Sequence, residues 1–229
     1  MPAFLLCVII SISCIGQKNA VPRPVPDSGY YELDKNESAI DAANIIEAKG
    51  GQGSMPEWFL TFIGGGIEAV ERIDAYMDKY VFIAKNEGEN FTSLSKWADN
   101  FSVVYDFPIL AAARIEKRMI LTSSLYPDDE YGLFFETMVL SAYNGEYTGT
   151  IKEDTYWIKI KTNNGNETGE NENNSTQEIY NFFILITIDK AAMRSIIIRM
   201  MTESFSAVTP SNAQTAAVNR LRQGFFDGF

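Results

Sequence analysis

The chain has 229 residues, of which 46% are apolar, 21% charged and 13% aromatic. This composition is typical of a globular protein with a sizeable core, and it excludes a collagen-like or wholly disordered chain. The 30 acidic residues outnumber the 19 basic ones and give a net charge of −11. Nucleic acid is therefore not an expected partner, because phosphate contacts need clustered Lys and Arg.

Histidine is absent from the sequence, and the two cysteines lie at positions 7 and 14. These counts exclude a Ser-His-Asp triad and any metal site with a histidine ligand. Beyond Cys14 the chain also lacks a thiolate nucleophile and the cysteines of a zinc cluster. We therefore expect no catalytic, cofactor-binding or metal-binding residues of these kinds, which leaves carboxylates, Lys, Tyr, Ser and Thr for any chemistry.

The N-terminus carries an apolar run of about ten residues, 3–12, and the first charged residue comes later. A membrane-spanning helix needs roughly 20 apolar residues, so the run fits the core of a secretory signal peptide over residues 1–13. Ser13 before Cys14, followed by Ile15 and Gly16, resembles a bacterial lipobox. We expect Cys14 to be the lipidation site, carrying palmitate or another acyl chain. Secretion without a lipid, an uncleaved anchor and an ordinary apolar role for Cys14 are the alternatives.

Residues 14–54 have the composition of a tether. The stretch 21–26 (VPRPVP) favours an extended polyproline conformation, and 49–54 (KGGQGS) favours a flexible joint. Between them, the apolar residues of 38–49 (SAIDAANIIEAK) share one face at helical spacing and predict a short helix.

Residues 55–229 are expected to form one folded domain. Hydrophobic periodicity predicts its elements in chain order, with Gly64–Gly66 as a loose turn and residues 163–178 as a polar low-complexity loop. For 130–143 a strand is the alternative to a helix. The predicted elements are a helix over 68–77, a strand over 80–84, a helix over 94–123 interrupted at Pro108, a helix over 130–143, strands over 146–162 and 179–188, and helices over 190–203 and 211–223.

The predicted fold class is α+β, with a small, mainly antiparallel sheet of about three strands, two helices on one face and further N- and C-terminal helices. The strand over 179–188 is apolar throughout, which predicts a central position, and it should form a hairpin with 146–162. In 146–162, Tyr156, Ile158 and Ile160 alternate with Trp157 and the lysines. We expect the two helices on the Tyr156 side, with 68–77 or 211–223 covering the other face.

Two sequence features could bind anions. Gly64–Gly66 before a helix is compatible with a phosphate loop, but no Lys-Ser or Lys-Thr follows, which favours a loose turn. Arg114, Lys117 and Arg118 share one helical face as an anion site or, as the simpler interpretation, as a solvated flank.

Three segments resemble a known family when taken in order: Met55–Phe59 (MPEWF), Tyr80–Met119, and Tyr180–Met193 (YNFFILITIDKAAM). They are similar to the small bacterial envelope lipoproteins named after a twenty-kilodalton lipoprotein (Lpp-twenty-like), and to the related N-terminal domain of a flagellar assembly protein. The resemblance implies a location in the cell envelope, a lipid anchor and a non-catalytic role.

Together these observations predict a non-enzymatic lipoprotein of the bacterial cell envelope, acting as a structural or interaction module. The lipid would hold it on a membrane facing the periplasm or the cell surface, with other envelope proteins as partners. One alternative is a binder of a small apolar ligand, lipid or peptide, using Trp58, Trp97 and Trp157. Another is a carboxylate-dependent periplasmic hydrolase, for which the candidate acids are Asp128, Asp129 and Glu130, or Glu153 and Asp154.

Overall fold

The computed structural model describes residues 31–32, 40, 42–51, 54–124, 132–163, 176–206, 211–227 and 229. The predicted signal peptide with Cys14, the acidic residues 128–130 and most of the polar loop lie outside these residues. The elements are β1 (Tyr31–Glu32), the 3-10 helix η1 (Ala42–Asn44), β2 (Ile45–Ala48), α1 (Glu57–Val70), the 3-10 helix η2 (Asp74–Tyr76), β3 (Lys79–Gly88), α2 (Phe91–Asn100), α3 (Phe107–Ser124), α4 (Gly132–Tyr143), β4 (Ile151–Asn163), β5 (Thr176–Asp189), α5 (Lys190–Ser206) and α6 (Asn212–Phe225).

The sheet is antiparallel throughout, with the strand order β1-β3-β5-β4-β2. The predicted α+β class and the β4–β5 hairpin are confirmed. The central position of β5 is also confirmed, since it pairs along its length with β3 on one side and β4 on the other. The three predicted strands are the long ones, and the sequence did not predict the two short edge strands.

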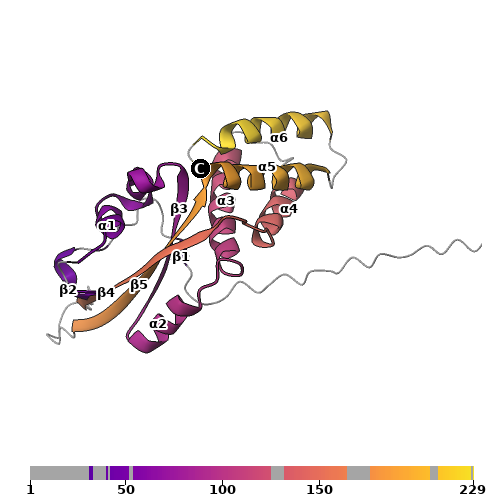
Figure 1. The fold of residues 1–229 in the computed structure, drawn as a ribbon. Coiled ribbons are helices and arrows are strands. Elements are labelled where there is room, and N and C mark those ends of the chain that lie inside the picture. The colour runs from indigo at the N-terminus through magenta and orange to yellow at the C-terminus, as the bar shows by residue number, and fades with distance from the viewer. Residues whose placement is uncertain are drawn as a thin grey trace, which may run out of the picture.

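Strand β5 is central because both of its faces are buried. Phe182, Ile184 and Ile186 lie in the larger of two hydrophobic cores, on the face covered by α2 to α6. Phe183 and Leu185 lie in the smaller core, on the opposite face, where α1 covers the sheet. Figure 1 shows this arrangement, with α1 on one side of the sheet and α3 to α6 on the other.

The predicted assignment of faces is wrong. Tyr156 and Ile158 of β4 belong to the smaller core under α1, whereas Trp157 packs against the larger core on the side of the other helices. Alternation shows which residues share a face, but it does not show which helices cover that face. Helix α6 joins the larger core through Val218, Leu221 and Phe225, and the second face is covered by α1 with Ile73 and Tyr76 packed beside it.

The predicted helix over 38–49 is also wrong. Its second half is strand β2, in which Ile45 pairs with Ile160 and Ala48 pairs with Ile158 of β4. Both Ile45 and Ala48 are buried while the two residues between them are exposed. Two buried residues three positions apart fit one face of a helix, and they also fit this strand because its register with β4 is irregular. Pairing with β4 is what makes the segment a strand. The folded domain therefore begins before residue 55.

Helix α1 spans the predicted glycine turn. It places Trp58, Phe59 and Phe62 on the sheet, and this packing holds Gly64 and Gly65 in a helix. The chain kinks at Gly66, whose φ of 70° is a conformation that favours glycine. The helix predicted over 68–77 is therefore only the last turn of α1, followed by turns and η2.

The other helices follow the sequence more closely. Asn90 caps α2, since its side chain accepts a hydrogen bond from Ser93 N at 3.0 Å. The predicted interruption lies at residues 101–106, between α2 and α3, and Pro108 falls in the first turn of α3. Residues 132–143 form a helix rather than the alternative strand. In the described part of the chain no helix is long and apolar enough to cross a membrane.

Candidate functional site

Basic and aromatic side chains surround a hollow of about 360 Å³ at the end of the sheet where β3 begins and α5 begins. The pairing of β3 with β5 explains why these starts meet, because Tyr80 lies opposite Ile188, two residues before Lys190. Lys190 fixes the junction, since its backbone N donates to Asp78 O at 2.9 Å and its Nζ donates to Met77 O at 2.6 Å. The hollow is lined by Glu68, Glu71, Arg72, Tyr80, Lys190, Arg194, Phe226 and Phe229.

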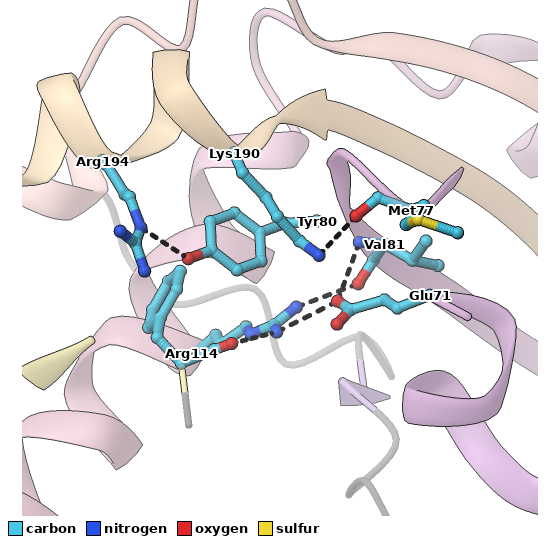
Figure 2. A network of polar contacts seen from close by, with 8 residues as sticks. Glu71, Met77, Tyr80, Val81, Arg114, Lys190 and Arg194 are labelled. Atoms are coloured by element: carbon cyan, nitrogen blue, oxygen red, sulfur yellow. Dashed lines mark hydrogen bonds and ion pairs between the residues drawn. The ribbon is translucent and has the colours of Figure 1, made fainter. Parts of the chain in front are cut away.

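Arg114 of α3 lies next to the hollow and is only 6% exposed. Figure 2 shows its guanidinium between Val81 and Glu71. Its Nη1 donates to Val81 O at 2.9 Å, and its Nη2 donates to Glu71 Oε1 at 3.2 Å and to Phe229 O at 2.7 Å. The same Glu71 oxygen accepts from Val81 N at 3.0 Å.

These bonds close part of the edge of β3. Strand β1 pairs with β3 only at Ala84 and Lys85, so it does not cover Val81. Both the backbone N–H and the C=O of Val81 are instead bound by side chains, those of Glu71 and Arg114. Buried backbone groups need such partners, and a sheet edge left open invites pairing with another chain.

Aromatic rings surround the Arg114 guanidinium. Its Cζ lies 5.3 Å from the ring centre of Tyr80 and 4.9 Å from those of Phe82 and Phe229. A cation over ring faces is attracted by the negative face of each ring. This buried charge is thus neutralised by Glu71 and supported by three rings.

Lys190 and Arg194 also line the hollow, and the hydrogen-bond acceptors that they contact are uncharged. Arg194 Nε donates to the Tyr80 hydroxyl across 3.4 Å, and the Arg194 guanidinium lies 5.1 Å from the centre of the Phe226 ring. Lys190 Nζ lies 5.8 Å from the centre of the Tyr80 ring. Among the described residues, no carboxylate lies within ion-pair distance of either group, whereas Arg72 pairs with Glu68 at 3.9 Å. The hollow therefore has an excess of positive charge.

Comparison of the chain with protein-family models, with curated proteins and with solved structures found no match. The resemblance to small envelope lipoproteins therefore stays a prediction, and the properties of the site rest on its own geometry.

Neither interpretation of Arg114, Lys117 and Arg118 describes all three residues. Lys117 is exposed, but Arg114 is buried and Arg118 binds the end of α6. Arg118 Nε donates to Phe225 O at 2.7 Å and its Nη2 donates to Gly224 O at 2.6 Å and to Asp227 O. The two arginines therefore hold the C-terminal segment 224–229 against α3.

Of the proposed catalytic acids, the structure describes Glu153 and Asp154, which lie at a bulge in β4. Each carboxylate has its own donors. Glu153 Oε1 accepts from Lys79 Nζ at 2.8 Å and from the Thr187 hydroxyl at 2.6 Å. Asp154 accepts from Trp58 Nε1 at 2.9 Å and from Thr155 N at 2.7 Å.

Burial alone would raise the pKa of Glu153, but the hydrogen bonds from Lys79 and Thr187 outweigh it and hold this pKa below its ordinary value. A general acid at neutral pH needs the opposite shift. The arrangement suits a carboxylate that anchors β4 to β3 and β5. No group of three or more metal-ligating side chains occurs in the described part of the chain.

The tryptophans lie in three different places. Trp58 is in the smaller core, while Trp97 and Trp157 are partly buried against the larger core. Sequence reasoning missed the grouping of Tyr80 with Lys190 and Arg194, because Tyr80 lies 110 positions from the first and 114 from the second. The available signal was the i, i+4 spacing of Lys190 and Arg194 at the start of a helix that directly follows the central strand.

Proposed function

We propose that the protein is a lipid-anchored bacterial envelope protein whose α+β domain is a non-enzymatic binding module. The apolar run before Cys14 supports the anchor, because it is long enough for a signal peptide and too short to span a bilayer. The polar, proline-containing sequence that follows suits a segment between an anchor and a folded domain.

One observation favours a binding function over hydrolysis. The carboxylate of Glu153 accepts hydrogen bonds from Lys79 and Thr187, and although burial alone would raise its pKa, these bonds lower it. The side chains that the fold does gather around a hollow are cationic and aromatic, which is chemistry for recognition.

Metabolic labelling with radioactive palmitate in a bacterial host, followed by membrane fractionation, tests the anchor. We expect the protein to incorporate label and to sediment with membranes. Cys14→Ala should abolish labelling, and the matched control Cys7→Ala should retain it. Labelling that persists in Cys14→Ala, or a parent chain that is never labelled, would refute the lipid anchor.

A further inference from the structure

The hollow beside Tyr80 combines unneutralised positive charge with an aromatic lining, in which Phe226 is partly exposed and Tyr80 and Phe229 are buried. In a chain of net charge −11, four basic side chains converge there, Arg72, Arg114, Lys190 and Arg194, against the two side-chain carboxylates of Glu68 and Glu71 and the main-chain oxygen of Phe229, which accepts from Arg114. Arg72 and Arg114 are paired with those carboxylates. The two charges that remain, on Lys190 and Arg194, are what an anion entering the hollow would meet.

We propose that this hollow is a binding site for an organic phosphate, that is, a phosphate group carried on an apolar or aromatic body. Two uncompensated cations match a dianion better than a single carboxylate. A guanidinium can also donate two parallel N–H bonds to phosphate oxygens, and a lysine ammonium adds a compact charge. Figure 2 shows Arg194 reaching the Tyr80 hydroxyl and Lys190, from the same helix, passing beside the Tyr80 ring to the carbonyl of Met77.

The aromatic side chains provide the second half of the site. Phe226 lies under the Arg194 guanidinium, and Phe229 packs edge-on against Tyr80 with ring centres 5.0 Å apart. Phe226 is the partly exposed ring beside the cations, and a hydrocarbon or aromatic group next to a phosphate would lie on it, with the buried rings of Tyr80 and Phe229 behind. The volume of about 360 Å³ is at the lower end for ligand sites, so the occupant is a phosphate with a small body or the headgroup region of a lipid.

The site does not depend on the lipid anchor, so the two proposals fail separately. The test is isothermal titration of the purified full chain with phenyl phosphate, inorganic phosphate and benzoate. We expect saturable binding of phenyl phosphate, weaker binding of inorganic phosphate because it lacks the ring, and weaker binding of benzoate because it carries one charge. Sedimentation with vesicles that contain phosphatidic acid, whose headgroup is a phosphate monoester, compared with phosphatidylglycerol, a diester with one charge, asks whether a lipid headgroup is a source of the phosphate.

Substitutions in α5 and at Phe226 test whether phenyl phosphate binds in the hollow. Arg194→Gln should weaken phenyl phosphate binding about tenfold, because it removes a charged, bidentate donor. Arg199→Gln removes the same charge from an exposed position of the same helix outside the hollow, and it should change affinity less than about twofold. Phe226→Leu should weaken binding of phenyl phosphate more than binding of inorganic phosphate. If thermal unfolding shows Arg194→Gln to be destabilised, Arg194→Lys keeps the charge without the fork and should give an intermediate loss.

Loss of soluble phosphate binding in Arg194→Gln supports the site with a free ligand. Loss of binding to phosphatidic acid vesicles alone supports it with a lipid headgroup. The proposal is overturned if neither probe binds, if Arg199→Gln weakens binding as much as Arg194→Gln, or if benzoate binds as tightly as phenyl phosphate.

Discussion

Replacing Arg114 with methionine tests whether its contacts hold the edge of the sheet. Methionine keeps most of the apolar volume, so the change removes the charge and hydrogen bonds with little loss of packing. The carbonyl oxygens of Val81 and Phe229 would lose a donor, and the Glu71 side chain, 15% exposed, would lose its cation.

The expected cost follows from those losses. Each buried acceptor left without a donor costs about 1–3 kcal/mol, and removing one member of a buried ion pair costs about 3–5 kcal/mol in all. We expect Arg114→Met to lower the free energy of unfolding by about 3–5 kcal/mol, which is a fall in Tm of roughly 6–20 °C for a chain of this size.

Urea denaturation followed by far-UV circular dichroism measures the change. Lys117→Met is the matched control, because it removes the same charge from an exposed position on α3 and should stay within about 0.5 kcal/mol of the parent. Arg114→Met with Glu71→Leu should cost less than the two single changes added together, since no orphaned charge remains. Equal effects of Arg114→Met and Lys117→Met would refute the reasoning.

Two further predictions concern α1 and the bulge of β4. Gly64→Ala should stabilise the protein by about 0.4–1 kcal/mol, because Gly64 is helical and an added Cβ would contact no other atom. Gly66→Ala should destabilise the protein by more than that, because φ is 70° at Gly66. Thermal denaturation of both variants measures this, and equal changes in Tm would contradict a kink that needs glycine. Burial alone would raise the pKa of Glu153, but the bonds from Lys79 and Thr187 lower it, so the stability they provide is present above the ordinary glutamate pKa of about 4.3 and is lost as pH falls through the lower folded-state value. As the pH is lowered, the Tm of the parent should therefore fall more steeply than the Tm of Glu153→Gln. Parallel curves of Tm against pH would show that Glu153 makes no such contribution.

The sequence predicts the centre of this fold well because there local pattern and burial agree. The apolar run ending at Ile188 favoured a strand covered on both faces, and the polar loop between β4 and β5 favoured their antiparallel pairing, as the structure shows. Helices α3 and α5 each carry apolar side chains along one face, so each must pack that face against one apolar surface. Asn181 is the exception in β5, buried with neither amide atom bonded among the described residues.

Elements that depend on distant partners could not be predicted in this way. Strand β2 has four residues, and only β4 makes it a strand rather than the helix that Ile45 and Ala48 also fit. The charge pattern of α3 could not show that Arg114 is buried, because its partners lie 33 to 115 positions away.

The candidate site was missed for the same reason. It exists only because β3 pairs antiparallel with β5, which brings Tyr80 beside Lys190 and Arg194. Neither charge pattern nor hydrophobic periodicity carries information on which strands are neighbours.

With Cys14 lipidated as proposed, strand β1 would limit how far the domain can stand from a membrane. Tyr31 and Glu32 are paired with Lys85 and Ala84, so they belong to the sheet and not to a tether ending near residue 54. With Cys14 lipidated as proposed, only residues 15–30 separate the acyl chains from the sheet. Sixteen residues reach at most roughly 55 Å when fully extended, whereas a tether to residue 54 would reach about 140 Å. The domain would therefore work close to the bilayer, where its partners must come to it.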